Sequence, residues 1–191
     1  MKKTKILLLV LTLCLFLYAS LSASTSSEFS AHKAKKIEFF LKKIAKSKKT
    51  KVFLRRGSFS EDELNSYLNL VYAKRYAPEV KYMKLKLKEK NQISGTMKVK
   101  LLGKKYKDVP SFLRDFEIEF SGTIESTKYR MRYLFEDLKI NGANFSPELL
   151  DEAFGAAQGR VKDKKSLFDW FDFLPGIKKI ATDYKKITFF Y

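Results

Sequence analysis

Side chains that could carry out catalysis are scarce in this sequence. The single histidine, His32, stands among lysines, and the single cysteine, Cys14, lies in an apolar run near the start of the chain. A Ser-His-Asp triad, or a zinc site built from histidine and cysteine, needs more of these residues than the chain has. A Gly-rich phosphate loop and a Gly-x-Ser-x-Gly motif are also absent from the sequence. We therefore predict no catalytic residue, no metal site and no cofactor.

Carboxylates are the one remaining group that could support hydrolysis, because two acids suffice to cleave a glycosidic bond. Helix caps, turns and solvated faces account for these acids more simply, so we predict that the chain is not an enzyme. A carboxylate hydrolase stays as a third hypothesis, and it requires two acids roughly 5 to 10 Å apart in a cleft. The candidate acids are Glu61, Asp62, Glu63, Glu136, Asp137, Asp151, Glu152, Asp169 and Asp172.

The first 23 residues have the pattern of a secretory signal peptide. Lysines near the start precede an uncharged run at 6–18, and small residues such as Ser22 and Ser24 follow it. The run is shorter than the roughly 20 apolar residues of a membrane-spanning helix, so we expect cleavage near residues 22–24 rather than a retained anchor. The mature protein would then be exported to the periplasm or the extracellular space.

Positive charge dominates the rest of the chain. The formal net charge of the 191 residues is +18, and removal of residues 1–23 takes away only Lys2, Lys3 and Lys5. So basic a chain attracts anionic partners, which for an exported protein are an anionic membrane surface or an envelope polymer. A lysine-rich composition without any polyanionic ligand is the open alternative. The only cysteine leaves with the signal peptide, so the mature chain can form no disulfide.

Three helices are predicted from apolar periodicity and capping residues. Over residues 24–50, apolar side chains recur every three or four residues between lysines, which predicts an N-terminal basic amphipathic helix. That helix suits either packing on its own domain or lying on an anionic membrane. Ser60 and Glu63 then form a capping box, which opens a second helix that ends near Arg75. A third helix is expected where a proline follows the cap residue Ser146.

Alternation of apolar and charged residues predicts strands in most of the remaining chain. Opposite charges on the outer faces of neighbouring strands should form cross-strand pairs. Residues 51–191 are therefore predicted to form a single α+β domain with an antiparallel sheet of about six strands. The pattern gives hairpins at 83–88 with 93–101 and at 116–125 with 129–135, a closing pair at 177–181 and 187–191, and a short strand at 52–54 that Gly57 ends.

The apolar face of this sheet is the candidate ligand site. It is either an ordinary filled core or one wall of a groove for an acyl chain, for which Met and aromatic side chains are suitable. Trp170 stands in a dense aromatic segment near lysines, which suits either core packing or contact with a membrane interface. The candidate ligand-binding residues are Met83, Leu85, Leu87, Met97, Val99, Phe116, Ile118, Phe120, Met131, Tyr133, Phe135 and Trp170.

Lysines on the opposite face and in a nearby loop are the candidate contact for an anionic surface. Because these lysines and the apolar side chains lie on opposite faces, nucleobases would find no stacking platform beside the cations, so we predict no nucleic acid partner. The candidate residues are Lys84, Lys86, Lys98, Lys162, Lys164 and Lys165.

Several short motifs resemble those of small exported bacterial envelope proteins, which we associate with the tubular lipid-binding (TULIP-like) half-barrels. They are FSEDELNSYL at 59–68, LKING at 138–142, SPELL at 146–150 and FLPGI at 173–177. The resemblance spans roughly residues 52–191. It implies a curved sheet packed against or around two to three helices, and a lipid or other apolar ligand. The heavy lysine content departs from the more neutral proteins of that group.

These features lead to two main hypotheses. The first is a non-enzymatic exported envelope protein that binds or carries a lipid or other apolar ligand between sheet and helix, while lysines attract anionic head groups. The alternative is a structural or adaptor module with a filled core, which binds an anionic envelope polymer or a protein partner through its lysine-rich surface. An open space between helix and sheet would favour the first hypothesis over the second.

Overall fold

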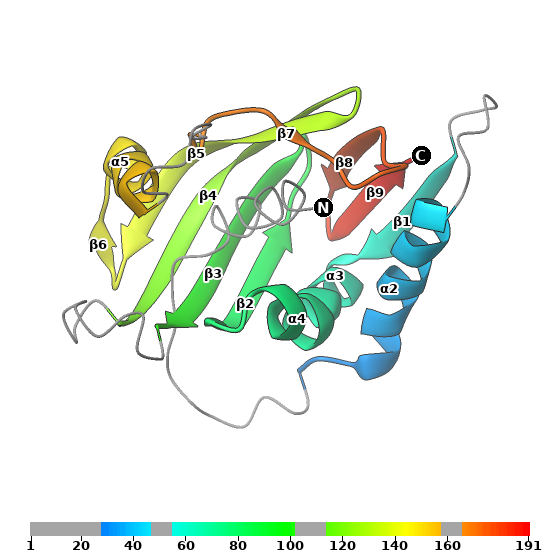
Figure 1. The fold of residues 1–191 in the computed structure, drawn as a ribbon, viewed down its shortest axis with the longest axis horizontal. Coiled ribbons are helices and arrows are strands. Elements are labelled where there is room, and N and C mark those ends of the chain that lie inside the picture. Colours follow the sequence, from blue (N-terminus) through cyan, green and yellow to red (C-terminus); the bar gives the residue numbers. More distant parts are fainter. Residues whose placement is uncertain (1–27, 47–54, 102–113, 158–165) are drawn as a thin grey trace.

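The structure is a computed structural model that describes residues 28–46, 55–101, 114–157 and 166–191 (Figure 1). The predicted signal peptide, the predicted strand at 52–54 and the lysines Lys162, Lys164 and Lys165 lie outside these residues. The α+β class with antiparallel sheets is confirmed. The elements are α2 (Ala31–Lys46), β1 (Arg56–Ser60), α3 (Glu61–Tyr67), the π-helix η1 (Leu68–Ala73), α4 (Lys74–Tyr76), β2 (Val80–Leu87), β3 (Gln92–Lys100), β4 (Asp115–Thr127), β5 (Arg130–Ile140), β6 (Ala143–Asn144), α5 (Pro147–Ala157), β7 (Phe171–Asp172), β8 (Lys179–Asp183) and β9 (Lys186–Phe190).

A six-stranded antiparallel sheet forms the centre of the domain, in the order β2-β3-β4-β5-β6 with β7 beside β5. Its strands alternate as predicted: in β2, Met83, Leu85 and Leu87 are buried and the lysines between them are exposed. The expected cross-strand pairing is also confirmed, since Lys98 of β3 lies 3.0 Å from Glu117 of β4. Both partners are partly exposed, so the pair contributes at most about 1 kcal/mol to stability.

A β-bulge in β5 keeps the inner face of this sheet continuous. Opposite β4, Phe135 pairs with Gly122 and Asp137 pairs with Ser121, which leaves Glu136 as the extra residue. Because of this insertion, Leu138 rather than Asp137 points into the core, where it is buried.

The last two strands belong to a second, three-stranded sheet in the order β1-β9-β8. The closing pair predicted at 177–181 and 187–191 therefore lies outside the six-stranded sheet. The prediction that Gly57 ends a strand is wrong, because Gly57 lies inside β1 and pairs with Phe189 of β9. A Cβ atom at this position would meet the ring of Phe40 from α2, so any larger residue would have to displace that ring. Glycine weakens a strand locally, but at this position its missing side chain leaves room for the Phe40 ring.

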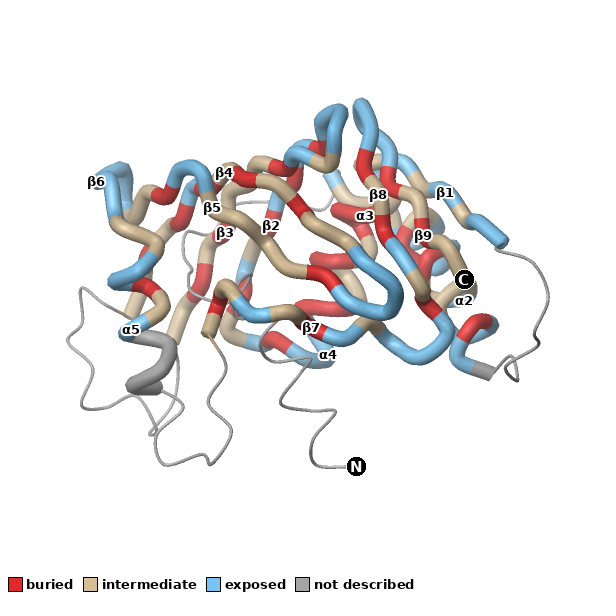
Figure 2. The backbone as a smooth tube through the Cα atoms, turned by 90° about the horizontal axis from the view of Figure 1, so that it is seen from above, coloured by how far each residue is buried: buried red, intermediate tan, exposed pale blue. Residues whose placement is uncertain are grey.

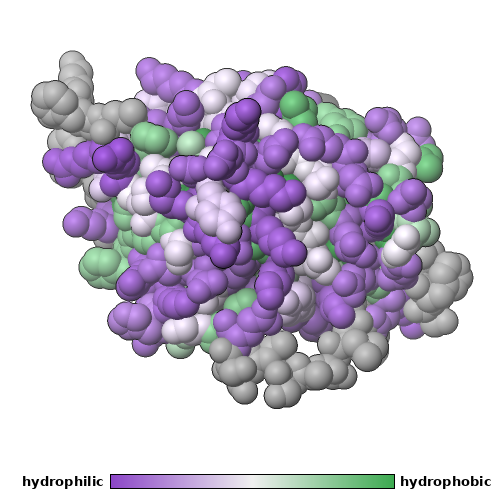
Figure 3. Space-filling model, turned by 180° about the vertical axis from the view of Figure 1, so that it is seen from behind, coloured by the Kyte–Doolittle hydropathy of each residue, from purple (hydrophilic) through white to green (hydrophobic). Residues whose placement is uncertain are grey.

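Hydrogen bonds from the large sheet hold the second sheet beside it. The N–H of Thr182 in β8 donates to Oδ1 of Asn91 in the β2–β3 turn at 2.8 Å, and the N–H of Ile180 donates to the Ser126 hydroxyl of β4 at 3.0 Å. The two sheets therefore follow one another along a single curved wall, with α2, α3 and α4 on its inner side (Figure 2). Hydrophilic side chains cover most of the outer side (Figure 3).

One continuous helix, made of α3, η1 and α4, runs beside β2. The predicted capping box opens it: the Ser60 hydroxyl accepts from the N–H of Glu63, and the Glu63 carboxylate accepts from the N–H of Ser60. The helix ends at Tyr76, one residue beyond the predicted end. The second helix is therefore confirmed, together with the signal that predicted its start.

Three polar side chains, which we call the edge ladder, bond this helix to the backbone of β2. Asn65 donates to the carbonyl of Leu85 at 2.9 Å and accepts from its N–H at 2.8 Å. Asn69 makes the same two bonds to Met83, at 2.6 and 2.8 Å. The Glu61 carboxylate accepts from the N–H of Leu87 at 2.6 Å. The spacing fits because four helical residues advance about 6 Å and two strand residues advance about 6.6 Å.

The N-terminal helix α2 packs on the domain through its apolar stripe. Ala34, Ile37 and Ile44 are buried, while most of its lysines are exposed. Lys33 pairs with Asp62 of α3 at 2.8 Å, and this exposed ion pair adds little to the apolar contact. Among the described helices, none is both long enough and apolar enough to cross a membrane.

Candidate functional site: an apolar cavity inside the curved wall

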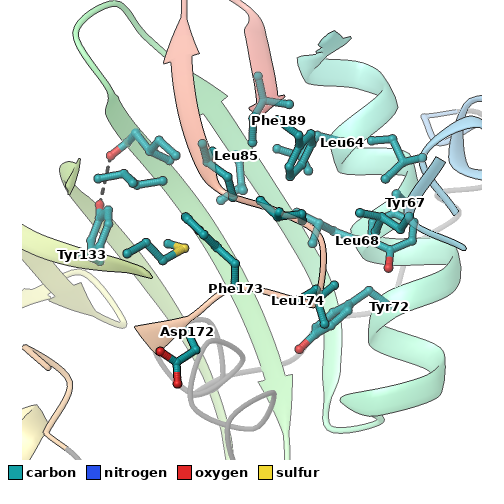
Figure 4. Close-up of a pocket in the computed structure, with 18 of the residues that line it drawn as sticks. Leu64, Tyr67, Leu68, Tyr72, Leu85, Tyr133, Asp172, Phe173, Leu174 and Phe189 are labelled. Atoms are coloured by element: carbon teal, nitrogen blue, oxygen red, sulfur yellow. Dashed lines mark hydrogen bonds between the residues drawn. The ribbon is translucent and has the colours of Figure 1, made fainter. Parts of the chain in front are cut away.

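The space between the curved wall and the helices contains a cavity of about 220 Å³. Among the described residues that line it, Asp172 alone is charged. Figure 4 shows apolar and aromatic side chains converging from both sheets, from the helices and from the segment that follows β7. The lining residues are Ile37, Leu41, Leu64, Tyr67, Leu68, Tyr72, Leu85, Ile93, Phe120, Ile124, Met131, Tyr133, Asp172, Phe173, Leu174, Pro175, Ile177, Ile180, Ile187 and Phe189.

The helix wall of the cavity is positioned by the edge ladder. Leu64, Leu68 and Tyr72 follow one another at four-residue spacing, as the ladder residues Asn65 and Asn69 do one position later. The two stripes are therefore adjacent on the same helix. Hydrogen bonds of one stripe to β2 hold the other stripe against the cavity.

The segment from Asp172 to Ile177 closes the cavity only in part. Leu174 is 39% exposed although it lines the cavity, so the mouth lies beside it. Gly176 has a φ of +96°, and a Cβ atom there would collide with Ile44 of α2. Glycine thus lets the segment turn while it presses against α2. The Asp172 carboxylate pairs with Arg130 at 3.0 Å, and in Figure 4 it points away from the apolar side chains.

Tyrosines supply the polar groups of the lining. Burial raises the pKa of Tyr67 to about 12, and burial also raises the pKa of Tyr72. Both phenols are therefore neutral at physiological pH and present hydroxyl groups rather than charges. The ring of Tyr72 lies 6.4 Å from Tyr67 and 5.4 Å from the exposed Tyr76. On the opposite wall, the Tyr133 hydroxyl donates to a backbone carbonyl of β3 at 3.0 Å.

The predicted ligand-binding residues divide into three groups in the structure. Leu85, Phe120, Met131 and Tyr133 line the cavity. Phe135 and Trp170 are half-buried outside it, and the guanidinium of Arg132 lies 4.9 Å from the Trp170 ring. The other six are buried in the core of the large sheet, away from the cavity lining: Met83, Leu87, Met97, Val99, Phe116 and Ile118.

The predicted anion contacts on the large sheet lie on its outer face. Lys84 pairs with Glu28, and Lys98 pairs with Glu117, so both already have an acidic partner. Lys86 is exposed. These lysines are separated from the cavity by the sheet itself.

Sequence reasoning missed the contributions of α2 and of the second sheet to the cavity. Ile37 and Leu41 lie on the recognised apolar stripe of α2, but periodicity does not tell which surface a stripe covers. Ile187 and Phe189 lie in the strand predicted at 187–191, but they reach the cavity from the second sheet. The carboxylate hydrolase would need two acids in the cleft, and the described lining supplies only Asp172. The described residues include no group of three His, Cys, Asp or Glu side chains that could hold a metal ion.

Comparisons of the chain with protein-family models, with curated proteins and with solved structures give no match. The resemblance to TULIP-like half-barrels therefore stays a prediction. The geometry of the cavity is the basis on which a function can be argued.

Proposed function

We propose that this is a non-enzymatic exported envelope protein that binds the alkyl chain of an amphiphile in its cavity. One observation carries the proposal: nineteen of the twenty described residues that line the cavity are apolar or aromatic, and they surround about 220 Å³. A water molecule finds few hydrogen-bond partners in such a space. An alkyl chain that enters it leaves water and makes close apolar contacts. The predicted signal peptide, and the envelope lipids that an exported protein meets, support the same conclusion.

The size of the cavity limits the ligand. A buried apolar cavity of about 150 Å³ holds benzene, which has six carbon atoms. Scaled in proportion, this cavity accepts about nine carbon atoms of an alkyl chain. The ligand is then a single chain of medium length or the end of a longer chain, and a two-chain lipid would leave most of its carbon atoms outside.

A series of chain lengths tests the proposal. Saturated carboxylates from hexanoate to hexadecanoate are titrated into the protein by calorimetry, or by displacement of a fluorescent fatty acid. Each CH₂ group contributes about 0.8 kcal/mol, so affinity should rise about fourfold per carbon atom up to about nine carbons and then level off. Absence of binding at every length, or binding that does not depend on length below that limit, would overturn the proposal.

A blocking variant locates the binding site. Leu41 lines the cavity from α2 and is only partly buried, so Leu41→Trp should fill the space without displacing the core. Most of the carboxylate binding should then be lost. Leu149→Trp is the matched control, because Leu149 of α5 is 52% exposed and lies outside the cavity lining. Equal binding by both variants would place the ligand elsewhere.

The alternative function is an adaptor module that binds an anionic envelope polymer or a protein partner through its lysine-rich surface. The hydrophilic outer face in Figure 3 favours it. The ion pairs of Lys84 and Lys98 with acidic residues reduce the charge that this face offers. Salt-sensitive binding to an anionic polymer, in a protein that binds no carboxylate of the series, would support the adaptor over the carrier.

A further inference from the structure

Three exposed apolar side chains lie around the cavity mouth and on the adjoining helix. Phe39 of α2 is 72% exposed, Tyr76 of α4 is 44% exposed, and Leu174 after β7 is 39% exposed. We call these three residues, together with the exposed Lys35 and Lys43 beside Phe39, the rim surface.

Single exposed apolar residues are ordinary. Tyr76 and Leu174 lie on the side of the opening. Phe39 lies on the outer face of α2, since Ile37 and Leu41, two residues before and after it, line the cavity. Three such side chains on neighbouring elements call for a partner.

Contacts link the three elements that carry the rim surface. Arg75, next to Tyr76, pairs with Glu38 at 3.1 Å and so joins α4 to α2 beside Phe39. Tyr76 contacts the ring of Tyr72, which lines the cavity together with Leu174. In Figure 4, Leu174 and Tyr72 lie next to each other at the lower side of the cavity. The segment that carries Leu174 also presses against the C-terminal half of α2 through Gly176.

Lysines surround the exposed ring of Phe39. They stand three and four residues before and after it on α2, and these four positions are its neighbours on the helix surface. Lys36 and Lys42 pair with Glu63 and Glu38, both at 2.9 Å. Within the part of the chain that the structure describes, Lys35 and Lys43 have no ion-pair partner and are exposed. Two of the four lysines that border the ring, Lys35 and Lys43, thus keep a positive charge that no described acidic residue neutralises.

We infer that the rim surface docks the protein onto an anionic lipid bilayer, with Phe39 at head-group depth and Lys35 and Lys43 on phosphates. A bilayer accommodates both parts of this surface, because an aromatic ring is stable at the interface and each lysine gains from the negative surface potential. An anionic polymer would attract the lysines but leave the ring in water. Docking brings the membrane to α2, the helix that contributes Ile37 and Leu41 to the cavity wall. That placement serves ligand exchange only if the proposed function holds, whereas docking itself does not depend on it.

Vesicle binding tests the inference, with the protein in the form that its host produces. Sedimentation with vesicles of phosphatidylcholine and phosphatidylglycerol is compared with sedimentation with phosphatidylcholine alone. Lys35→Gln with Lys43→Gln should weaken binding to the anionic vesicles about 25-fold, since each lysine near the surface contributes about fivefold. Phe39→Ala should weaken binding about tenfold, and this part should persist at high salt.

Matched controls keep the result specific. Lys86→Gln with Lys88→Gln removes the same charge from the large sheet, and Tyr184→Ala removes a side chain that is 65% exposed at another site. Both should bind vesicles as the unaltered protein does. Equal weakening by the two lysine pairs, or binding that is insensitive to Phe39→Ala, would overturn the inference and would instead indicate binding to anions in general.

Ligand binding in the cavity and docking through the rim surface can be refuted independently. Leu41→Trp should lose carboxylate binding in solution and keep vesicle binding, while the rim variants should do the reverse. Vesicle binding without carboxylate binding would refute the proposed function and leave docking intact. Carboxylate binding without vesicle binding would refute docking alone.

Discussion

Replacing Asn65 with alanine is a direct test of how this fold is held together. Asn65 is 5% exposed and forms two hydrogen bonds with the backbone of Leu85, at 2.9 and 2.8 Å. Strand β2 is the first strand in the order of its sheet, so no other described strand of that sheet pairs with its outward backbone groups. The Asn65 amide supplies the donor and the acceptor that such a strand would supply. Asn65→Ala removes both.

The magnitude follows from these two bonds. A typical hydrogen bond contributes about 1 kcal/mol to stability, and a buried backbone group left without a partner costs about 1 to 3 kcal/mol. For one N–H and one carbonyl, with partial rescue by water, we expect the free energy of unfolding to fall by about 2 to 4 kcal/mol. In a domain of this size that loss lowers the melting temperature by about 5 to 15 °C.

Urea unfolding followed by circular dichroism measures the loss. Asn144→Ala is the matched control, because Asn144 is an exposed asparagine of β6, and its replacement should change stability by less than about 0.5 kcal/mol. Asn65→Asp keeps the acceptor for the Leu85 N–H and loses the donor to the carbonyl, so it serves if the alanine variant does not fold. A loss no greater than that of the control, for Asn65→Ala or Asn65→Asp, would refute the role assigned to the edge ladder.

Two further predictions concern the pH dependence of stability. Burial raises the pKa of Glu63, but hydrogen bonds from Lys36 and Ser60 outweigh it and hold this pKa below 4.5. The stabilisation from ionised Glu63 is present above pH 4.5 and disappears as the pH falls through the lowered pKa. The difference in stability between the unaltered protein and Glu63→Gln should therefore shrink in acid. A constant difference in urea titrations would contradict this. Burial raises the pKa of Tyr67 from 10 to about 12, so its contribution is present below pH 10 and declines as the pH rises toward 12. Tyr67→Phe should therefore lose less stability than the unaltered protein over that alkaline range, and equal losses in thermal unfolding would contradict this.

Features that depend on near neighbours in the sequence were predictable. The capping box of Ser60 and Glu63 involves residues three apart, and the alternation in β2 and β3 involves residues two apart. Both patterns carry their own structural signal, since side-chain period and capping chemistry are local. The α+β class followed from the order of such segments.

Features that depend on distant partners were not predictable. Strand β1 contains Gly57, which weakens a strand locally, and it forms because β9 from the end of the chain supplies the pairing partner. Asn65 and Asn69 resemble ordinary polar positions of an amphipathic helix until β2 is placed beside them. The bulge at Glu136 likewise becomes visible only from the register with β4. The cavity depends on all of these contacts, so only part of its lining could be named in advance.

The edge ladder also explains why an open space persists inside the curved wall. Leaving an apolar cavity of about 220 Å³ unfilled would cost about 5 kcal/mol at about 24 cal/mol per Å³, so a helix free to move would shift toward the middle of the sheet and close it. Asn65, Asn69 and Glu61 oppose this shift with five hydrogen bonds to β2, which at about 1 kcal/mol each are of the same magnitude. The helix therefore stays at the sheet edge, and Phe120 and Tyr133 remain open to an alkyl chain. It follows that Asn65→Ala should weaken carboxylate binding as well as stability, because the helix that loses its anchor is also a wall of the cavity.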